Sequence, residues 1–97
     1  MTRKIYKFWK NDCTPCRALS KKLETMKIPD DVEIISLNID NENNFQLAIA
    51  NGISSVPALL DEKGNKLIGL MPDKEIIEFI NRSANEISNR ADFQINW

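Results

Sequence analysis

Residues 3–16 read RKIYKFWKNDCTPC and place two cysteines directly behind a short segment of aromatic and β-branched residues. The segment from Arg3 to Trp9 is typical of a β-strand, and the polar pair Asn11-Asp12 ends it. A helix is expected from Thr14 to Lys27, because Pro15 suits a first turn and apolar residues recur at helical spacing, namely Leu19, Leu23 and Met26. Cys13 therefore lies at a strand-to-helix junction.

Two further elements follow after the turn at Pro29. Val32 to Ile39 is almost continuously apolar, which predicts a central strand buried on both faces and a right-handed βαβ unit. Asp40 to Asn51 predicts a second helix that ends at Gly52, a residue suited to the left-handed position after a helix. Its apolar face is expected to consist of Phe45, Ala48 and Ile49.

The last third of the chain predicts a hairpin and a helix. Ala58 to Asp61 and Lys66 to Leu70 are short strand candidates, expected to be antiparallel around the turn at residues 62–65. A final amphipathic helix is expected from Pro72, with an apolar face of Ile76, Ile77, Ile80, Ala84 and Ile87. The order βαβαββα predicts an α/β fold with a four-stranded mixed sheet and helices on both faces.

Bulk properties limit the function. At 97 residues one domain is expected, over residues 1–88, with a tail at residues 89–97. A net charge of −1 without basic clusters disfavours nucleic-acid and membrane binding. No apolar run is long enough to span a membrane, and no apolar run follows the basic residues between Met1 and Lys10. A cytoplasmic location is therefore expected, and the protein is also expected to be a monomer.

Histidine is absent, which excludes histidine acid–base catalysis and most zinc sites. A structural zinc needs four ligands, and two cysteines supply only half of them. We therefore expect no metal and no other cofactor.

The spacing of Cys13 and Cys16 at the start of a helix is typical of a redox motif in a reducing compartment. The helix N-terminus lowers the pKa of the Cys13 thiol, and Cys16, three residues on, can reach it. Cys13 is then predicted to attack a substrate disulfide, and Cys16 to resolve the mixed disulfide.

Four segments resemble the thioredoxin family. Phe8 to Cys16 is similar to its active-site segment, where Phe-Trp precedes Trp-Cys-Gly-Pro-Cys, and Leu37 to Asp40 is similar to the end of its next strand. Gly52 to Leu59 resembles the segment that carries the family's cis-proline, and Gly64 and Gly69 match two family glycines. The resemblance covers roughly residues 5–88.

This resemblance implies a thioredoxin-like fold and a thiol–disulfide oxidoreductase that reduces protein disulfides, recharged by a thioredoxin reductase or by glutathione. It implies that Pro57 is cis and that the Val56 backbone pairs with an extended substrate. The residues that it implies in substrate binding are Trp9, Asp12, Thr14, Pro15, Val56, Pro57 and Gly69.

The chain also departs from the family. It lacks the extra first strand and helix of longer thioredoxins, and Asp12 and Thr14 replace Trp and Gly of the motif. Lys7 stands where the family has a buried Asp, and Ser36 where it has a lysine. Asp12 is expected to oppose a Cys13 thiolate, while the Lys7 ammonium either approaches the cysteines and offsets this effect or extends to solvent.

Two alternative functions are consistent with the sequence. A glutathione-dependent, glutaredoxin-like enzyme fits the short topology and Val56-Pro57, although Thr14-Pro15 differs from its usual Pro-Tyr pair and Leu70 interrupts its Gly-Gly motif. A non-catalytic module of the same fold would use Trp9 and Val56-Pro57 as a docking surface.

Overall fold

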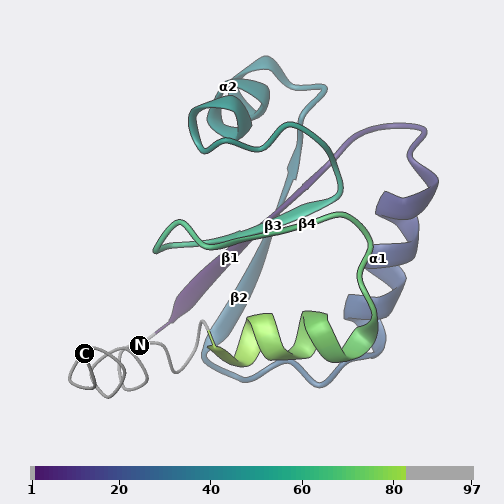
Figure 1. Cartoon of the computed structure of the whole chain (residues 1–97), viewed down its shortest axis with the longest axis vertical. Coiled ribbons are helices and arrows are strands. Elements are labelled where there is room, and N and C mark those ends of the chain that lie inside the picture. Colours follow the sequence, from purple (N-terminus) through teal and green to yellow (C-terminus); the bar gives the residue numbers. More distant parts are fainter. Residues whose placement is uncertain (1, 83–97) are drawn as a thin grey trace, which may run out of the picture.

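The computed structural model describes residues 2–82, which form a mixed sheet with helices packed on both faces (Figure 1). The strands are β1 (Arg3–Trp9), β2 (Val32–Asn38), β3 (Ala58–Asp61) and β4 (Lys66–Ile68), in the spatial order β2-β1-β3-β4. β1 runs parallel to β2 and antiparallel to β3, which pairs antiparallel with β4. The predicted four-stranded mixed sheet and the hairpin are confirmed.

Three helices connect or follow these strands: α1 (Thr14–Thr25), α2 (Glu42–Ala50) and a third helix over residues 73–82. α1 ends two residues earlier than predicted, because the backbone becomes extended at Met26. α2 begins after Asn41, whose side chain accepts a hydrogen bond from the Asn44 N–H. The left-handed conformation predicted for Gly52 is confirmed, with a φ of +74°.

The alternation of side chains along β1 divides the core into two clusters, one on each face of the sheet. Ile5 belongs to the cluster formed with α1 and the third helix, whose buried members are Ile5, Leu19, Leu23, Val32, Leu59, Ile76, Phe79 and Ile80. Phe8 belongs to the cluster on the α2 face, with Ala48, Ile53, Ala58 and Leu60. The α1 face therefore carries the larger core.

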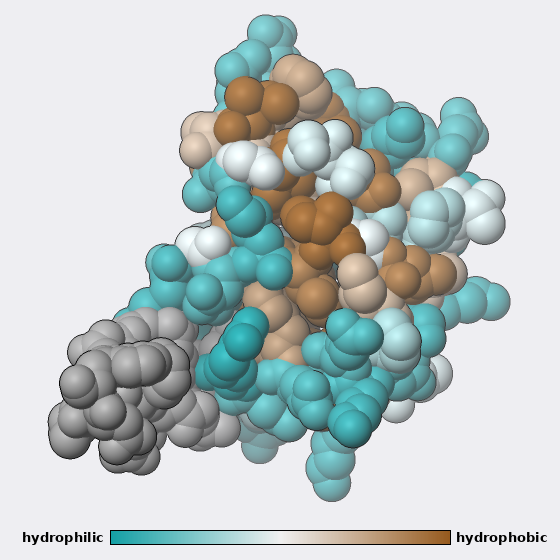
Figure 2. Space-filling view, viewed as in Figure 1, coloured by the Kyte–Doolittle hydropathy of each residue, from teal (hydrophilic) through white to brown (hydrophobic). Residues whose placement is uncertain are grey.

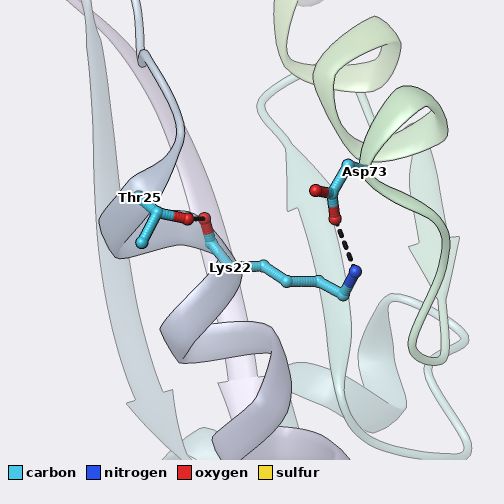
Figure 3. Close-up of polar contacts among 3 residues, drawn as sticks. All are labelled: Lys22, Thr25 and Asp73. Atoms are coloured by element: carbon cyan, nitrogen blue, oxygen red, sulfur yellow. Dashed lines mark hydrogen bonds and ion pairs between the residues drawn. The ribbon is translucent and has the colours of Figure 1, made fainter.

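An ion pair joins the two helices of the larger face. The Lys22 ammonium in α1 pairs with the carboxylate of Asp73 at the start of the third helix (Figure 3). The Thr25 hydroxyl donates to the carbonyl of Lys22 at 3.0 Å, and the same carbonyl accepts from the N–H of Met26 at the end of α1. The side chains of Lys22 and Asp73 are both exposed to solvent in part, so their ion pair contributes little to the stability of the fold.

The prediction that Val32 to Ile39 forms a central strand was wrong, since β2 lies at one edge of the sheet and β1 is central. The apolar run has another cause. Val32 and Ile34 pack into the α1-face cluster, whereas Leu37 and Ile39 pack into the α2-face cluster. A strand covered on both faces is apolar on both faces wherever it stands in the sheet.

Three further predictions, on the third helix, β4 and α2, differ from the structure. Ile77 is exposed, and Phe79, which the prediction omitted, takes the core position in the third helix. β4 stops at Ile68 and leaves Leu70 exposed. Phe45 and Ile49 of α2 are exposed, so only Ala48 of the predicted face is buried. Ala84, Ile87, the boundary at residue 88 and the tail at residues 89–97 lie outside the described residues.

Candidate active site

Cys13 and Cys16 form a disulfide at the N-terminus of α1, with their Cα atoms 5.2 Å apart. Cys13 is the N-cap residue, and its Sγ accepts a hydrogen bond of 3.1 Å from the backbone N–H of Cys16. Its carbonyl accepts from the N–H of Arg17, so the helix starts directly behind it. Cys13 is 5% exposed and Cys16 2% exposed, so both residues of the disulfide are buried in the oxidised protein.

Hydrogen bonds hold the loop that leads into the cysteine pair. The Asn11 N–H donates to Asp40 Oδ2 at 2.9 Å, and Asn38 Nδ2 donates to Asn11 Oδ1 at 3.2 Å. Asp12, which follows, adopts the left-handed φ of +55° that favours Gly, Asn or Asp. The loop before Cys13 is thus tied to the end of β2, and its sharp turn directs the chain into α1.

A cavity of about 490 Å³ lies behind Cys16, between α1 and the sheet. Lys7 and Trp9 both line it from β1, as expected for two residues that are two positions apart in a strand. The Lys7 Nζ donates a hydrogen bond of 2.7 Å to Ser20 Oγ. Burial lowers the pKa of the Lys7 ammonium, and the carboxylate of Glu24 partly counteracts this effect.

The segment with Pro57 lies at the same end of the sheet. The Val56-Pro57 bond is cis, in agreement with the resemblance. Ala58, the next residue, pairs with Phe8 near the end of β1, so Pro57 lies beside the strand end that leads to Cys13. The N–H of Gly69 donates to the Pro57 carbonyl at 2.7 Å, which ties Pro57 to the end of β4.

A second hollow, of about 250 Å³, lies between α2 and the segment before Pro57. Phe45, Ile49 and Val56 line it together with Lys10 at its polar side. Figure 2 shows apolar side chains gathered over α2 on the visible face. Phe45 is 43% and Ile49 is 52% exposed, so this hollow is an apolar surface depression.

The structure divides the predicted site residues among these places. Trp9 and Asp12 line the cavity behind Cys16, whereas Val56 lines the apolar hollow. Thr14 and Pro15 are exposed in the first turn of α1. Sequence reasoning missed Ser20 and Glu24, although their spacing of four and eight residues from Cys16 predicts one face of a helix.

Two further properties of the described chain bear on its chemistry. Within residues 2–82, no group of three or more histidine, cysteine or acidic side chains is arranged to hold a metal ion. The same residues contain no helix that is both long and apolar enough to cross a membrane.

Comparisons with known proteins agree on one family. A family model described as Thioredoxin matches residues 2–82. A thioredoxin from Rickettsia bellii is 29% identical over 82 residues, covering 78% of this chain and 76% of its own. A mutant thioredoxin from Halobacterium salinarum has a similar fold, with a TM-score of 0.68 and 23% identity over 84% of this chain and 74% of its own. Since the family model matches most of the chain, the protein belongs to the thioredoxin family and is a thiol–disulfide oxidoreductase.

Proposed function

We propose that this protein reduces disulfide bonds of other proteins, with Cys13 as the nucleophile and Cys16 as the resolving thiol. The observation that carries this proposal is the position of Cys13 Sγ, which accepts the Cys16 N–H at the start of α1. In the reduced protein, the same N–H groups and the helix dipole stabilise a negative charge on this sulfur. Cys16 lies within the first turn of α1, so its sulfur does not occupy this N-cap position.

The reaction proceeds by two exchanges. The Cys13 thiolate attacks one sulfur of the substrate disulfide, forms a mixed disulfide, and releases the other substrate sulfur as a thiolate that takes up a proton. Cys16 then loses its proton and attacks Cys13 Sγ. The bond to the substrate breaks, its second sulfur leaves as a thiolate, and the protein retains the Cys13–Cys16 disulfide seen in this structure.

We place the substrate across the end of the sheet near Pro57. Val56 precedes the cis Pro57, and in this proposal its backbone pairs with an extended peptide, a mode in which main-chain hydrogen bonds supply affinity. In this proposal Trp9 and Asp12, which line the cavity with Cys16, and Thr14 and Pro15 of the first turn of α1 contact the substrate on the α1 side, and Gly69, bonded to the Pro57 carbonyl, contacts it on the other side.

As a member of the thioredoxin family, the protein has disulfide substrates and reductase partners in general. We further propose that a thioredoxin reductase or glutathione returns electrons to the oxidised pair. A reducing compartment, the cytoplasm, suits a chain whose two cysteines form a redox motif. There the protein would act as a monomer in electron transport and cell redox homeostasis.

Reduction of insulin by dithiothreitol tests the roles of the cysteines. We expect the unmodified protein to accelerate the reaction and Cys13→Ser to abolish the acceleration. Cys16→Ser, reduced beforehand and mixed with insulin after removal of dithiothreitol, should accumulate a mixed disulfide. The double Cys→Ser variant is the matched control for thiol-independent effects. A mixed disulfide trapped through Cys16 in the Cys13→Ser protein would reverse the assignment, and an equally active double variant would exclude the dithiol chemistry.

A further inference from the structure

A polar stripe on α1 connects the more buried cysteine to a lysine on the sheet. Cys16, Ser20 and Glu24 follow each other at intervals of four residues, so they lie on one face of the helix. All three line the cavity behind Cys16, as does Lys7 from β1. The Lys7 Nζ is fixed at 2.7 Å from Ser20 Oγ, one helical turn from Cys16. Its ammonium is therefore held on the Cys16 side of the redox pair.

Lys7 differs from the other charged groups around this cavity in its burial. Five further charged side chains line the cavity, and each is exposed: Lys10, Asp12, Arg17, Lys21 and Glu24. Water and salt screen the charges of these five, whereas the half-buried Lys7 ammonium acts through a medium of lower dielectric constant. Three of the five are cationic, so they do not cancel the positive charge of Lys7 at Cys16.

The Lys7 ammonium also makes no ion pair among the described residues. Among the described residues no carboxylate lies within 4.0 Å of its Nζ, and the hydroxyl of Ser20 is neutral. Burial accordingly lowers the pKa of this group, although Glu24 limits the effect. A partly buried cation without an ion-pair partner has a desolvation cost, and a thiolate formed nearby would reduce that cost.

We propose that Lys7 is a positioning residue for the resolving step, in which its ammonium, held by Ser20, stabilises the thiolate of Cys16. In the mixed disulfide Cys13 carries no charge, so Cys16 is the sulfur that ionises. Its proton passes to water in the cavity, and its thiolate attacks Cys13 Sγ while the substrate sulfur leaves with the electron pair of the broken bond. This inference rests on the proposed role of Cys16.

The two exchanges can be observed separately with 5,5′-dithiobis(2-nitrobenzoate), an aromatic disulfide whose released thiolate absorbs visible light. Reduced protein mixed with one equivalent should release one thiolate as Cys13 attacks and a second, without dependence on concentration, as Cys16 resolves. The pH dependence of the second phase then reports the ionisation of Cys16 in the mixed disulfide.

We expect Lys7→Met to slow the second phase about tenfold at neutral pH and to move its pH midpoint upward by about one unit, with the first phase unchanged. Lys7→Arg, which keeps the charge, should retain a fast second phase, and Ser20→Ala should slow it less than Lys7→Met. Thermal unfolding establishes that each variant is folded. Lys7→Met is expected to fold, because it replaces a partly buried charge with an apolar side chain.

Two results would overturn the role of Lys7: an unchanged second phase in Lys7→Met, or an equal slowing of both phases. Failure of the proposed cysteine roles has a different signature: Cys13→Ser, rather than Cys16→Ser, would then release one thiolate at the rate of the first phase of the unmodified protein. The same comparison of phases therefore distinguishes the two proposals.

Discussion

The two faces of the sheet differ in how completely their helices cover them. On the α1 face, two helices bury a cluster of eight residues, and an open cavity behind Cys16 lies between α1 and the strands. On the α2 face, one helix of nine residues buries only Ala48 and leaves Phe45, Leu47 and Ile49 exposed. The better packed face therefore holds the redox pair, and the less covered face presents apolar surface beside Val56.

This difference suits the two tasks of a disulfide reductase. Two sulfurs that must exchange a bond need a rigid support, which a helix packed into a large core supplies. A polypeptide substrate, in contrast, gains affinity from apolar surface that stays accessible in the free protein. The following predictions test this division of roles.

The largest effect is expected for stability on the α1 face. Leu19 is fully buried in α1, and Leu19→Ala should lower the free energy of unfolding by about 3 kcal/mol, because it removes buried methylene groups and leaves a cavity. Ile49→Ala, at an exposed position of α2, should change it by less than about 0.5 kcal/mol. Urea unfolding followed by circular dichroism measures both. Equal losses would show that α2 is as tightly packed as α1.

A smaller effect is expected on substrate affinity at the apolar hollow. Phe45→Ser should raise the KM for insulin about fivefold, since about 1 kcal/mol of apolar contact is lost. Leu47→Ser is the matched control, because Leu47 lies on the same helix with 41% exposure against 43% for Phe45, yet lines a different depression. If both variants change the KM equally, the hollow beside Val56 has no special role.

The third prediction concerns pH and the charge on the α1 face. Because burial lowers the pKa of Lys7 below its ordinary 10.5, the unfolded chain binds more protons than the folded protein between these two values. The cost of the buried charge is present at neutral pH and is relieved as pH rises through the lowered pKa. Stability relative to Lys7→Met should therefore increase between pH 7 and pH 10. A difference that does not vary with pH, measured by urea unfolding, would show that the ammonium remains hydrated.

The smallest effect is expected at Asp12, which is exposed and next to Cys13. Its carboxylate opposes a thiolate, so Asp12→Asn should lower the pKa of the Cys13 thiol by less than about one unit after screening by solvent. The rate of iodoacetamide alkylation against pH in the Cys16→Ser background measures this value. An unchanged profile would show that the side chain points away from the sulfur and would favour a role in partner recognition.

Local patterns predicted much of the fold because short-range chemistry determines them. The bounds of β1 and β3 are as predicted, and Gly52 takes the left-handed conformation that ends α2. The cis bond before Pro57 agrees with an expectation that came from the resemblance and not from the spacing of residues. The position of Cys13 at the start of a helix could be predicted from three local features: the strand before it, the polar loop and Pro15 in the first helical turn.

Long-range arrangement explains the predictions that were wrong. An apolar run shows that β2 is covered on both faces, but only pairing with β1 shows that it is an edge strand. Helical spacing allowed Ile77 or Phe79 to face the core, and packing against α1 and the sheet selected Phe79. In α2, the small Ala48 approaches the sheet while Phe45 and Ile49 remain outside.

The amino-acid sequence by itself determined the order of elements, the redox pair and its place at a helix N-terminus, because these depend on neighbours within a few residues. Tertiary structure alone decided that Lys7 contacts Ser20 on the Cys16 side, since that contact joins residues 13 positions apart on different elements. It likewise decided which apolar side chains stay exposed. Burial is a property of the packed molecule, and a periodic pattern shows only that a face exists, not what covers it.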